Sequence, residues 1–144
     1  MFSDVVSGFS RTVAITAEVR DRLVAHAREA APDECCGVLL GRGDDIIEAV
    51  RARNAAESAS TRFVIDPKDH IDARRDARTR GLDVLGFYHS HPRSGAAPSD
   101  TDLAEAVYPG GLYIIVGLGA DPPEVRVFGF DNGNFHERPL VTVG

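Results

Sequence analysis

The sequence is poor in three features that each mark a class of proteins: cysteine, long apolar runs and an excess of basic residues. Its only two cysteines, Cys35 and Cys36, are adjacent, a spacing that disfavours an unstrained disulfide and indicates reduced thiols. No apolar run approaches the roughly 20 residues of a membrane span, and residues 1–6 show no basic region leading into an apolar stretch. The formal net charge of −6 argues against a nucleic-acid partner, because nucleic-acid-binding domains usually carry a basic face. We therefore expect a soluble, cytoplasmic protein that binds neither nucleic acid nor membrane.

What is present is the composition of one globular domain. The chain has 144 residues, of which 43% are hydrophobic and 26% are charged, enough for one substantial core. It contains no internal repeat, low-complexity tract or long linker. Residues 1–144 are therefore predicted to form a single domain, with residues 1–10 as a loosely ordered tail.

Three helices are indicated by apolar spacing and by residues that favour helix ends. Thr16 can cap a helix over residues 17–30, and Asp66 followed by Pro67 announces a second helix that runs to about Arg80. A third helix is expected from Ser99 to Val107. The apolar stripe that the first helix would bury recurs at three- to four-residue spacing: Val19, Leu23, Ala27 and Ala30.

Short apolar or alternating segments between these helices predict strands. The segment 83–91 contains the continuous apolar stretch 84–88, which predicts a central strand covered on both faces. The predicted strands are Arg11–Ile15, Gly37–Gly41 paired as a hairpin with Ile46–Ala52, Phe63–Ile65, Asp83–His91, Leu112–Leu118, and Val125–Phe130 paired with Phe135–Val143. The fold class expected from this order is α/β, a mixed β-sheet flanked by helices.

Two histidines and an aspartate suggest a metal site. His89 and His91 stand two residues apart at the end of a predicted strand, so their side chains project from the same face. Asp102, on the helix that follows, can approach from the side, and three such ligands leave one position open for water. A lone histidine on a strand is usually a packed or exposed polar residue, but a pair beside apolar neighbours favours ligation, since an unpaired buried imidazole is costly.

Asp102 also has a structural explanation. Ser99 followed three residues later by an acid resembles a capping box at the start of a helix. The two explanations are compatible, because capping would hold Asp102 in the first helical turn, facing the strand ends where the histidines lie.

The spacing of these residues resembles a known signature. The run His89-Ser90-His91-Pro92, followed by Ser99 and Asp102, is similar to the metalloprotease motif of the JAMM family, also called Mov34/MPN/PAD-1. Upstream, Glu34-Cys35-Cys36-Gly37 resembles the family's second block. The resemblance covers nearly the whole chain and implies a cytidine-deaminase-like α/β fold, the JAB1/MPN domain.

The same resemblance implies a role for each matching residue. His89, His91 and Asp102 would bind one Zn²⁺ per chain, Glu34 would be the general base, and the Ser99 hydroxyl would steady the oxyanion. Spacing alone leaves Asp33 open as the base.

The implied activity is that of a zinc metalloprotease of the short prokaryotic type. It would hydrolyse the peptide or isopeptide bond after the Gly-Gly tail of a ubiquitin-like or sulfur-carrier protein, releasing cysteine or another amine. The alternative is a non-catalytic scaffold that binds partners through the same sheet. A zinc deaminase fits less well, because it would require His-x-Glu and a later Pro-Cys-x-x-Cys. The sequence leaves the oligomeric state open.

Overall fold

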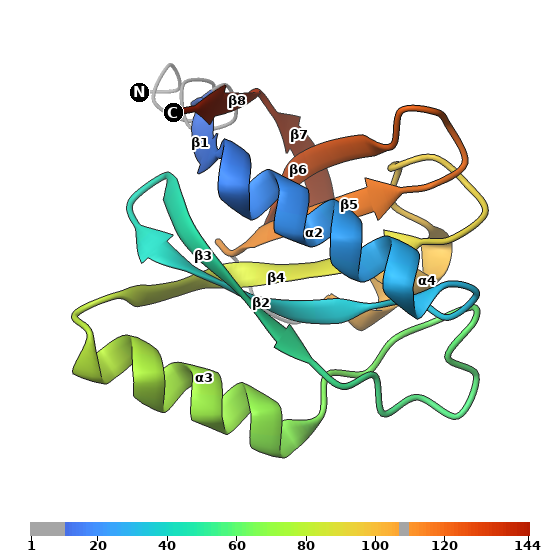
Figure 1. Cartoon of the computed structure of the whole chain (residues 1–144), viewed down its shortest axis with the longest axis horizontal. Helices are drawn as coiled ribbons and strands as arrows, with labels where there is room; N and C mark the ends of the chain where they lie inside the picture. The colour runs from blue at the N-terminus through green and yellow to red at the C-terminus, as the bar shows by residue number, and fades with distance from the viewer. Residues whose placement is uncertain (1–10, 107–109) are drawn as a thin grey trace.

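The computed structural model describes residues 11–106 and 110–144 (Figure 1). The expected tail, residues 1–10, lies outside this part of the chain. Within it, eight strands form one mixed sheet in the order β7-β6-β5-β4-β2-β3-β1-β8. The predicted mixed sheet with flanking helices is confirmed. The elements are β1 (Val13–Thr16), α2 (Ala17–Ala30), β2 (Cys36–Arg42), β3 (Asp45–Ala52), α3 (Pro67–Thr79), β4 (Asp83–His91), α4 (Asp100–Glu105), β5 (Leu112–Gly117), β6 (Glu124–Asp131), β7 (Asn134–Arg138) and β8 (Leu140–Val143).

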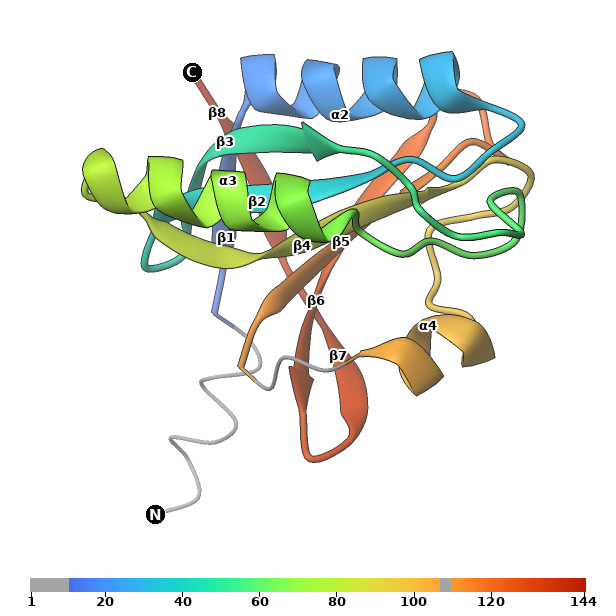
Figure 2. The same ribbon diagram turned by 90° about the horizontal axis from the view of Figure 1, so that it is seen from below.

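The core has two layers, one on each face of the sheet. On one face, Val19, Leu23 and Ala27 of α2 pack in a buried cluster with residues of β1, β4 and β5. On the other face, Ala73 and Ala77 of α3 pack against β2, β4 and β5. Figure 2 shows α2 along one side of the sheet and α4 on the other side. The helix that carries Asp102 therefore lies across the sheet from α2.

Strand β4 lies in the middle of the sheet, as its apolar sequence predicts. It pairs antiparallel with β2 and parallel with β5. Phe87 belongs to the cluster beneath α3, whereas Tyr88 belongs to the cluster beneath α2. Because side chains alternate along a strand, His89 and His91 share the face of Phe87.

Both predicted helix caps are present. The Thr16 side chain accepts a hydrogen bond from the Val19 amide at 3.1 Å, and α2 spans the predicted residues 17–30. The Asp66 side chain accepts from the Asp69 amide, with Pro67 at the first position of α3. These local hydrogen bonds satisfy amides that have no partner inside the helix, which is why the helix starts could be read from sequence.

The predicted pairing with β6 is confirmed for residues 135–138, but the predicted continuous strand over 135–143 is wrong, because the segment divides at Pro139 into β7 and β8. Strand β7 pairs with β6, whereas β8 pairs in parallel with β1 at the other end of the strand order. Proline has no amide hydrogen to donate to a ladder, so it suits the corner between the two strands. Pro139 thus connects β7 and β8, which stand at opposite ends of the strand order, so the sheet curls back on itself.

The predicted strand over 63–65 is also wrong. Ile65 makes only an isolated antiparallel bridge with Asn54, and the rest of the segment is loop. The Val64 amide donates to the Asn54 side chain at 3.1 Å, so its hydrogen bond is made within the loop instead of with a neighbouring strand. A side chain that forms hydrogen bonds with backbone groups competes with the backbone pairing of a regular strand.

The third helix is shorter than predicted. It spans 100–105 with Ser99 as its N-cap, and Ala106 already has extended backbone angles. Pro109, further along the sequence, disfavours a longer helix. Val107, the predicted last residue, lies outside the described part of the chain.

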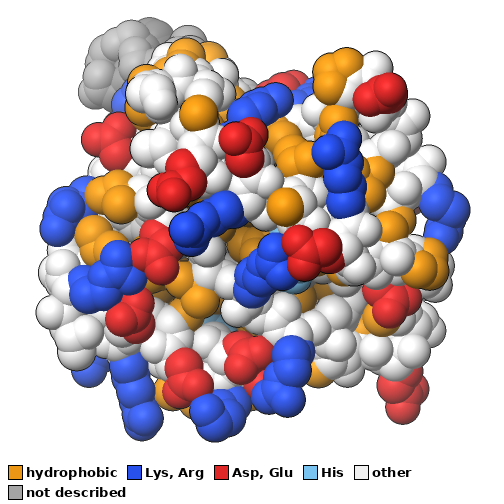
Figure 3. All heavy atoms as spheres, viewed as in Figure 1, with side chains coloured by type: hydrophobic (Ala, Val, Ile, Leu, Met, Phe, Trp, Pro, Cys, Tyr) orange, Lys and Arg blue, Asp and Glu red, His pale blue; other side chains and the backbone are white. Residues whose placement is uncertain are grey.

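Charges of both signs are interspersed on the face shown in Figure 3. The basic end of α3 follows this pattern, since Arg80 pairs with Asp76 and with Glu48 of β3. Among the described residues, no helix is both long enough and apolar enough to cross a bilayer.

Gly37 of β2 lies against Tyr88 of β4, its partner in the strand register. A Cβ atom at position 37 would overlap the Tyr88 ring and the carbonyl oxygen of Val50. We expect Gly37→Ala to lower the free energy of unfolding by about 1–3 kcal/mol, the usual range for overpacking, as measured by urea denaturation.

The matched control is Gly43→Asn, in the turn between β2 and β3. Nothing lies within 4 Å of a Cβ placed at residue 43, and asparagine tolerates its φ of +59°. This variant should stay within about 0.5 kcal/mol of the parent. Equal stability of the two variants would show that the Tyr88 contact is not restrictive.

Candidate metal centre

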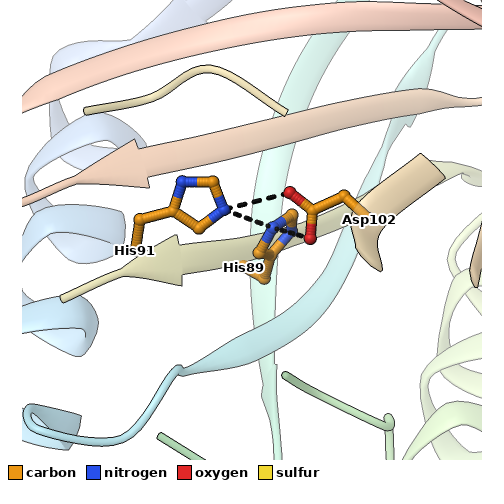
Figure 4. Close-up of side chains that lie close together, drawn as sticks. All are labelled: His89, His91 and Asp102. Carbon is orange, nitrogen blue, oxygen red and sulfur yellow. Dashed lines mark hydrogen bonds and ion pairs between the residues drawn. The ribbon is translucent and has the colours of Figure 1, made fainter. Parts of the chain in front are cut away.

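The three residues proposed as metal ligands come together at the end of β4 (Figure 4). His89 and His91 reach from the strand toward the carboxylate of Asp102 on α4, and the three side chains point toward one another. The three are nearly fully buried, with 2%, 7% and 8% exposure respectively. Polar groups buried this deeply need partners, and here they have one another.

The distances between the ligand atoms match a small cation. The two histidine Nε2 atoms are 3.3 Å apart, and they lie 2.9 and 3.0 Å from the Asp102 carboxylate oxygens. Ligands bound to zinc at about 2.0–2.1 Å in a tetrahedron are about 3.4 Å from one another. Two imidazole nitrogens and a carboxylate oxygen also form a donor set that zinc accepts, so the residues fit the ion that the resemblance implies.

Asp102 serves the helix start and the cluster together. The Ser99 amide donates to Asp102 Oδ2 at 2.9 Å, and the Asp102 amide donates to Ser99 Oγ at 3.0 Å. This is the reciprocal capping box that the sequence suggested. The capping box is confirmed, and it is compatible with the predicted metal-ligand role because the cap fixes the side chain that faces the histidines.

His91 is oriented from its other ring nitrogen. Its Nδ1 lies 2.9 Å from the Gly95 carbonyl oxygen, which accepts a hydrogen bond from the Nδ1–H tautomer and leaves Nε2 free for a metal. The loop that carries Gly95 is itself held, since the Ala96 amide donates to Glu124 Oε1 at 3.1 Å and the Gly119 amide donates to the Ser94 carbonyl at 2.9 Å. Residues 94–96 are therefore anchored to the end of β5 and to β6.

Burial and hydrogen bonding shift the pKa values of the cluster in different directions, and the shift of Asp102 is the one that favours metal binding. Burial lowers the pKa of His89, although Asp102 acts against it. Burial alone would lower the pKa of His91 too, but hydrogen bonds with Asp102 and Gly95 outweigh it and raise that pKa. Burial opposes ionisation of Asp102, yet the bonds to the two histidines hold its pKa far below the usual range. The low pKa keeps Asp102 ionised, and an ionised carboxylate is the form that binds a cation.

Glu34 lies next to this cluster, just before β2. Cys35 and Ser90 are joined by two hydrogen bonds, of 2.8 and 3.2 Å, and continuing that register sets Glu34 opposite His91. Its side chain is 6% exposed, and Oε1 is buried with no hydrogen-bond partner. Burial raises the pKa of Glu34 to about 7, with His91 lowering it and Asp102 raising it. Asp33, the alternative base, is instead exposed.

A cleft of about 330 Å³ opens beside the cluster. Glu34 and His91 line it together with Ser99, so the candidate base, one candidate ligand and the candidate oxyanion donor meet in one space. The remaining lining residues are Ser60, Thr61, Pro92, Arg93, Ser94, Ala97 and Thr101.

Sequence reasoning missed two residues at this site, Phe63 and Gly95. The Phe63 ring stacks on the His89 imidazole with centroids 4.4 Å apart and planes 19° apart. Phe63 was assigned to a strand, and nothing local marks its distant partner. Gly95 acts through its backbone carbonyl, which leaves no signal in residue type.

The other histidines and the cysteines stand outside the cluster. His26 bonds to the Tyr88 hydroxyl at 2.8 Å, on the α2 side of the sheet. Among residues 11–106 and 110–144, one group of three or more potential ligands is close enough to share an ion, and it is His89, His91 and Asp102. Both cysteines are free thiols, as the sequence predicts, and burial raises the pKa of Cys35 to about 11 and that of Cys36 to about 12, which disfavours the reactive thiolate at neutral pH.

Comparisons with known proteins identify the family of the chain. Residues 16–130 match the family model described as prokaryotic homologs of the JAB domain. The chain is 37% identical to a desampylase of Haloferax volcanii over 112 residues, which are 74% of this chain and 81% of that protein. It is 33% identical to the CysO-cysteine peptidase of Mycobacterium tuberculosis over 132 residues, 90% of each chain.

The fold is similar to that of a solved JAB1/MPN domain protein from Archaeoglobus fulgidus. The TM-score is 0.61 at 22% identity, covering 94% of this chain and 99% of that one. The JAMM resemblance and the JAB1/MPN fold inferred from the sequence are confirmed. With the family model spanning residues 16–130, the chain belongs to the prokaryotic branch of the JAB domain family.

Proposed function

We propose that this protein is a zinc-dependent peptidase or isopeptidase that cleaves after the C-terminal Gly-Gly of a ubiquitin-like or sulfur-carrier protein. The observation that carries the proposal is the cluster of His89, His91 and Asp102 beside Glu34, a buried carboxyl with an unpartnered oxygen, in one open cleft. Buried carboxyl groups with a perturbed pKa in a cleft are typical of functional sites.

His89, His91 and Asp102 would hold one zinc ion. Three protein ligands with a vacant fourth position are typical of catalytic zinc sites, whereas structural sites are closed by four. A zinc ion bound there lowers the pKa of water to about 7 and polarises a carbonyl group. The Gly95 carbonyl and the Phe63 ring hold the two imidazoles in position for this task.

Glu34 would act as the general base. A raised pKa of about 7 lets the carboxylate accept a proton near neutral pH and return it to the leaving amine. Its lack of a hydrogen-bond partner leaves Oε1 available to a water molecule in the cleft. The exposure of Asp33 favours Glu34 for this role.

Ser99 would donate to the oxyanion that forms on the attacked carbonyl. A hydroxyl has one donor and two acceptor positions, and the cap uses only an acceptor, for the Asp102 amide. The Ser99 hydroxyl hydrogen therefore remains free to point into the cleft that the residue lines.

The relatives support the substrate class. One is named a desampylase and another a peptidase of a CysO-cysteine adduct. For this chain we propose the corresponding chemistry, a carrier protein whose extended Gly-Gly tail enters the cleft, since glycine has no side chain to obstruct a close approach to the cluster. The amine released would be cysteine or the amine of another protein.

A direct test loads the protein with zinc and presents a ubiquitin-like carrier in two forms, extended by cysteine and joined to a lysine side chain. Mass spectrometry should show the free carrier ending in Gly-Gly. A carrier with Ala-Ala in place of Gly-Gly should remain uncleaved. Cleavage of unrelated peptides at the same rate would indicate a general peptidase, and binding of the carrier without cleavage would indicate the scaffold.

Replacing Ser99 separates its two roles. We expect Ser99→Ala to lower kcat by about 10²–10³-fold, the range for loss of one oxyanion donor, and to destabilise the protein by about 1 kcal/mol through loss of the cap. Ser99→Thr keeps the hydroxyl and should retain most of the activity.

The matched control is Thr16→Ala, which removes the N-cap of α2. It should reduce stability by a similar amount with kcat unchanged, as measured by thermal melting and carrier cleavage. Equal kcat values for Ser99→Ala and the parent would remove Ser99 from the proposed mechanism.

A further inference from the structure

The side chain of Asn54 organises the loop that follows β3. Its Nδ2 donates to the carbonyl oxygens of Glu34 at 3.0 Å and of Arg62 at 3.1 Å, with a longer contact of 3.5 Å to Ala59. Its Oδ1 accepts from the amides of Ala56 at 3.0 Å and Val64 at 3.1 Å. We call residues 54–64 the cleft loop. The Asn54 side chain thus links both ends and the interior of the cleft loop to the backbone of Glu34.

The cleft loop contacts His89 and the elements around the candidate site. Phe63 stacks on His89, and Ser60 and Thr61 line the cleft. Both carboxylate oxygens of Glu105, on the helix that carries Asp102, accept from Arg62 Nη2 at 2.9 Å. The Ser60 carbonyl accepts from Arg93 at 3.4 Å.

The backbone of Glu34 is held by this same loop. The Glu34 amide donates to the Ala59 carbonyl at 2.8 Å, and the Glu34 carbonyl accepts from Asn54 at 3.0 Å. The carboxyl group has an oxygen with no partner of its own. The position of that oxygen therefore depends largely on the backbone of Glu34. Two hydrogen bonds to this backbone come from Asn54 and from the loop that Asn54 organises.

We propose that Asn54 is a positioning residue for catalysis, acting through the cleft loop on Glu34. The inference rests on the proposed function, in which Glu34 is the base. Because misplacement of a catalytic group by about 1 Å can lower the rate about 10²-fold, loosening the backbone of Glu34 reduces turnover without removing any group that touches substrate.

Two variants of Asn54 test the proposal. Asn54→Ala removes all contacts of the amide group. Asn54→Asp keeps an oxygen that can accept from the Ala56 and Val64 amides, but presents a carboxylate to the Glu34 carbonyl, which has nothing to donate to it. The matched control is Asn134→Ala, which removes the single bond from an exposed turn side chain to the Asn132 carbonyl.

Three quantities are measured: kcat and KM for the carrier adduct, zinc content, and hydrogen exchange at individual amides. Both Asn54 variants should retain one zinc ion and show kcat lowered about tenfold or more, with a smaller change in KM. Exchange of the Glu34 amide should rise about tenfold in both. The Val64 amide should lose protection in Asn54→Ala and keep it in Asn54→Asp, and the control should match the parent throughout.

The exchange measurement does not depend on activity. If the parent protein cleaves no carrier, the proposed function fails, while faster exchange at Glu34 still reports the anchoring by Asn54. Unchanged kcat in Asn54→Asp with faster exchange at Glu34 would overturn the positioning role. Loss of zinc and general unfolding in both variants would overturn it too, since Asn54 would then serve the fold alone.

Discussion

Glu34→Gln is expected to lower kcat by about 10²–10⁴-fold, the usual contribution of a general base, while one zinc ion stays bound. Glutamine has the shape of glutamate but cannot accept a proton at neutral pH. Because the replaced carboxyl is buried with an unpartnered oxygen and its pKa is raised to about 7, removing the ionisable group should not reduce stability. Carrier cleavage, zinc content and thermal melting measured on the same preparation would check all three expectations.

The neighbouring acid provides the control. Asp33 is exposed, so Asp33→Asn should retain the kcat of the parent. If instead Asp33→Asn were inactive and Glu34→Gln turned over normally, the base would be Asp33. Normal turnover by both variants would remove the carboxylate base from the mechanism.

His89→Ala is expected to abolish zinc binding and activity together. His89 supplies one of three ligand atoms, and its loss leaves Asp102 Oδ1 without its 2.9 Å partner in a buried site. Removing an outer-shell partner of a metal site typically lowers affinity about 10–100-fold, so removing a ligand should lower it more. Elemental analysis after dialysis should find one zinc ion per chain in the parent and close to none in the variant.

His136→Ala is the matched control, because His136 lies on β7, a strand that carries no residue of the candidate site. It should keep one zinc ion and the kcat of the parent. Full zinc occupancy in His89→Ala would show that the ion binds elsewhere, and the proposed centre would have to be abandoned.

Local signals in the sequence were sufficient where the structure depends on neighbouring residues. The predicted helix over about 17–30 is confirmed, because its cap and its apolar stripe lie within one segment. The pairing predicted between 125–130 and 135–143 requires a tight turn, and Asn132 and Gly133, which tolerate positive φ, adopt φ of 50° and 75° there. The close grouping of His89, His91 and Asp102 followed from strand alternation and from the helix start at Ser99.

The errors arose where distant segments meet. The segment 63–65 has the residue types of a strand, but the side chain of Asn54, nine or more positions upstream, accepts the Val64 amide hydrogen. Residues 135–143 also have an alternating pattern, yet β8 finds its partner in β1, at the start of the described chain. Neither partner leaves a mark on the segment itself.

The helix starts, most of the strands and the three candidate metal ligands could be predicted from the sequence alone, because periodicity, caps and covalent spacing act over a few residues. Only the tertiary structure decided which acid faces the cleft, how the two ends of the strand order meet, and what holds the imidazoles. Those outcomes depend on burial and on hydrogen bonds between segments far apart in the chain. Glu34 and Asp33 are adjacent in sequence, but Glu34 is buried between the cleft loop and the end of β4, whereas Asp33 is exposed to water.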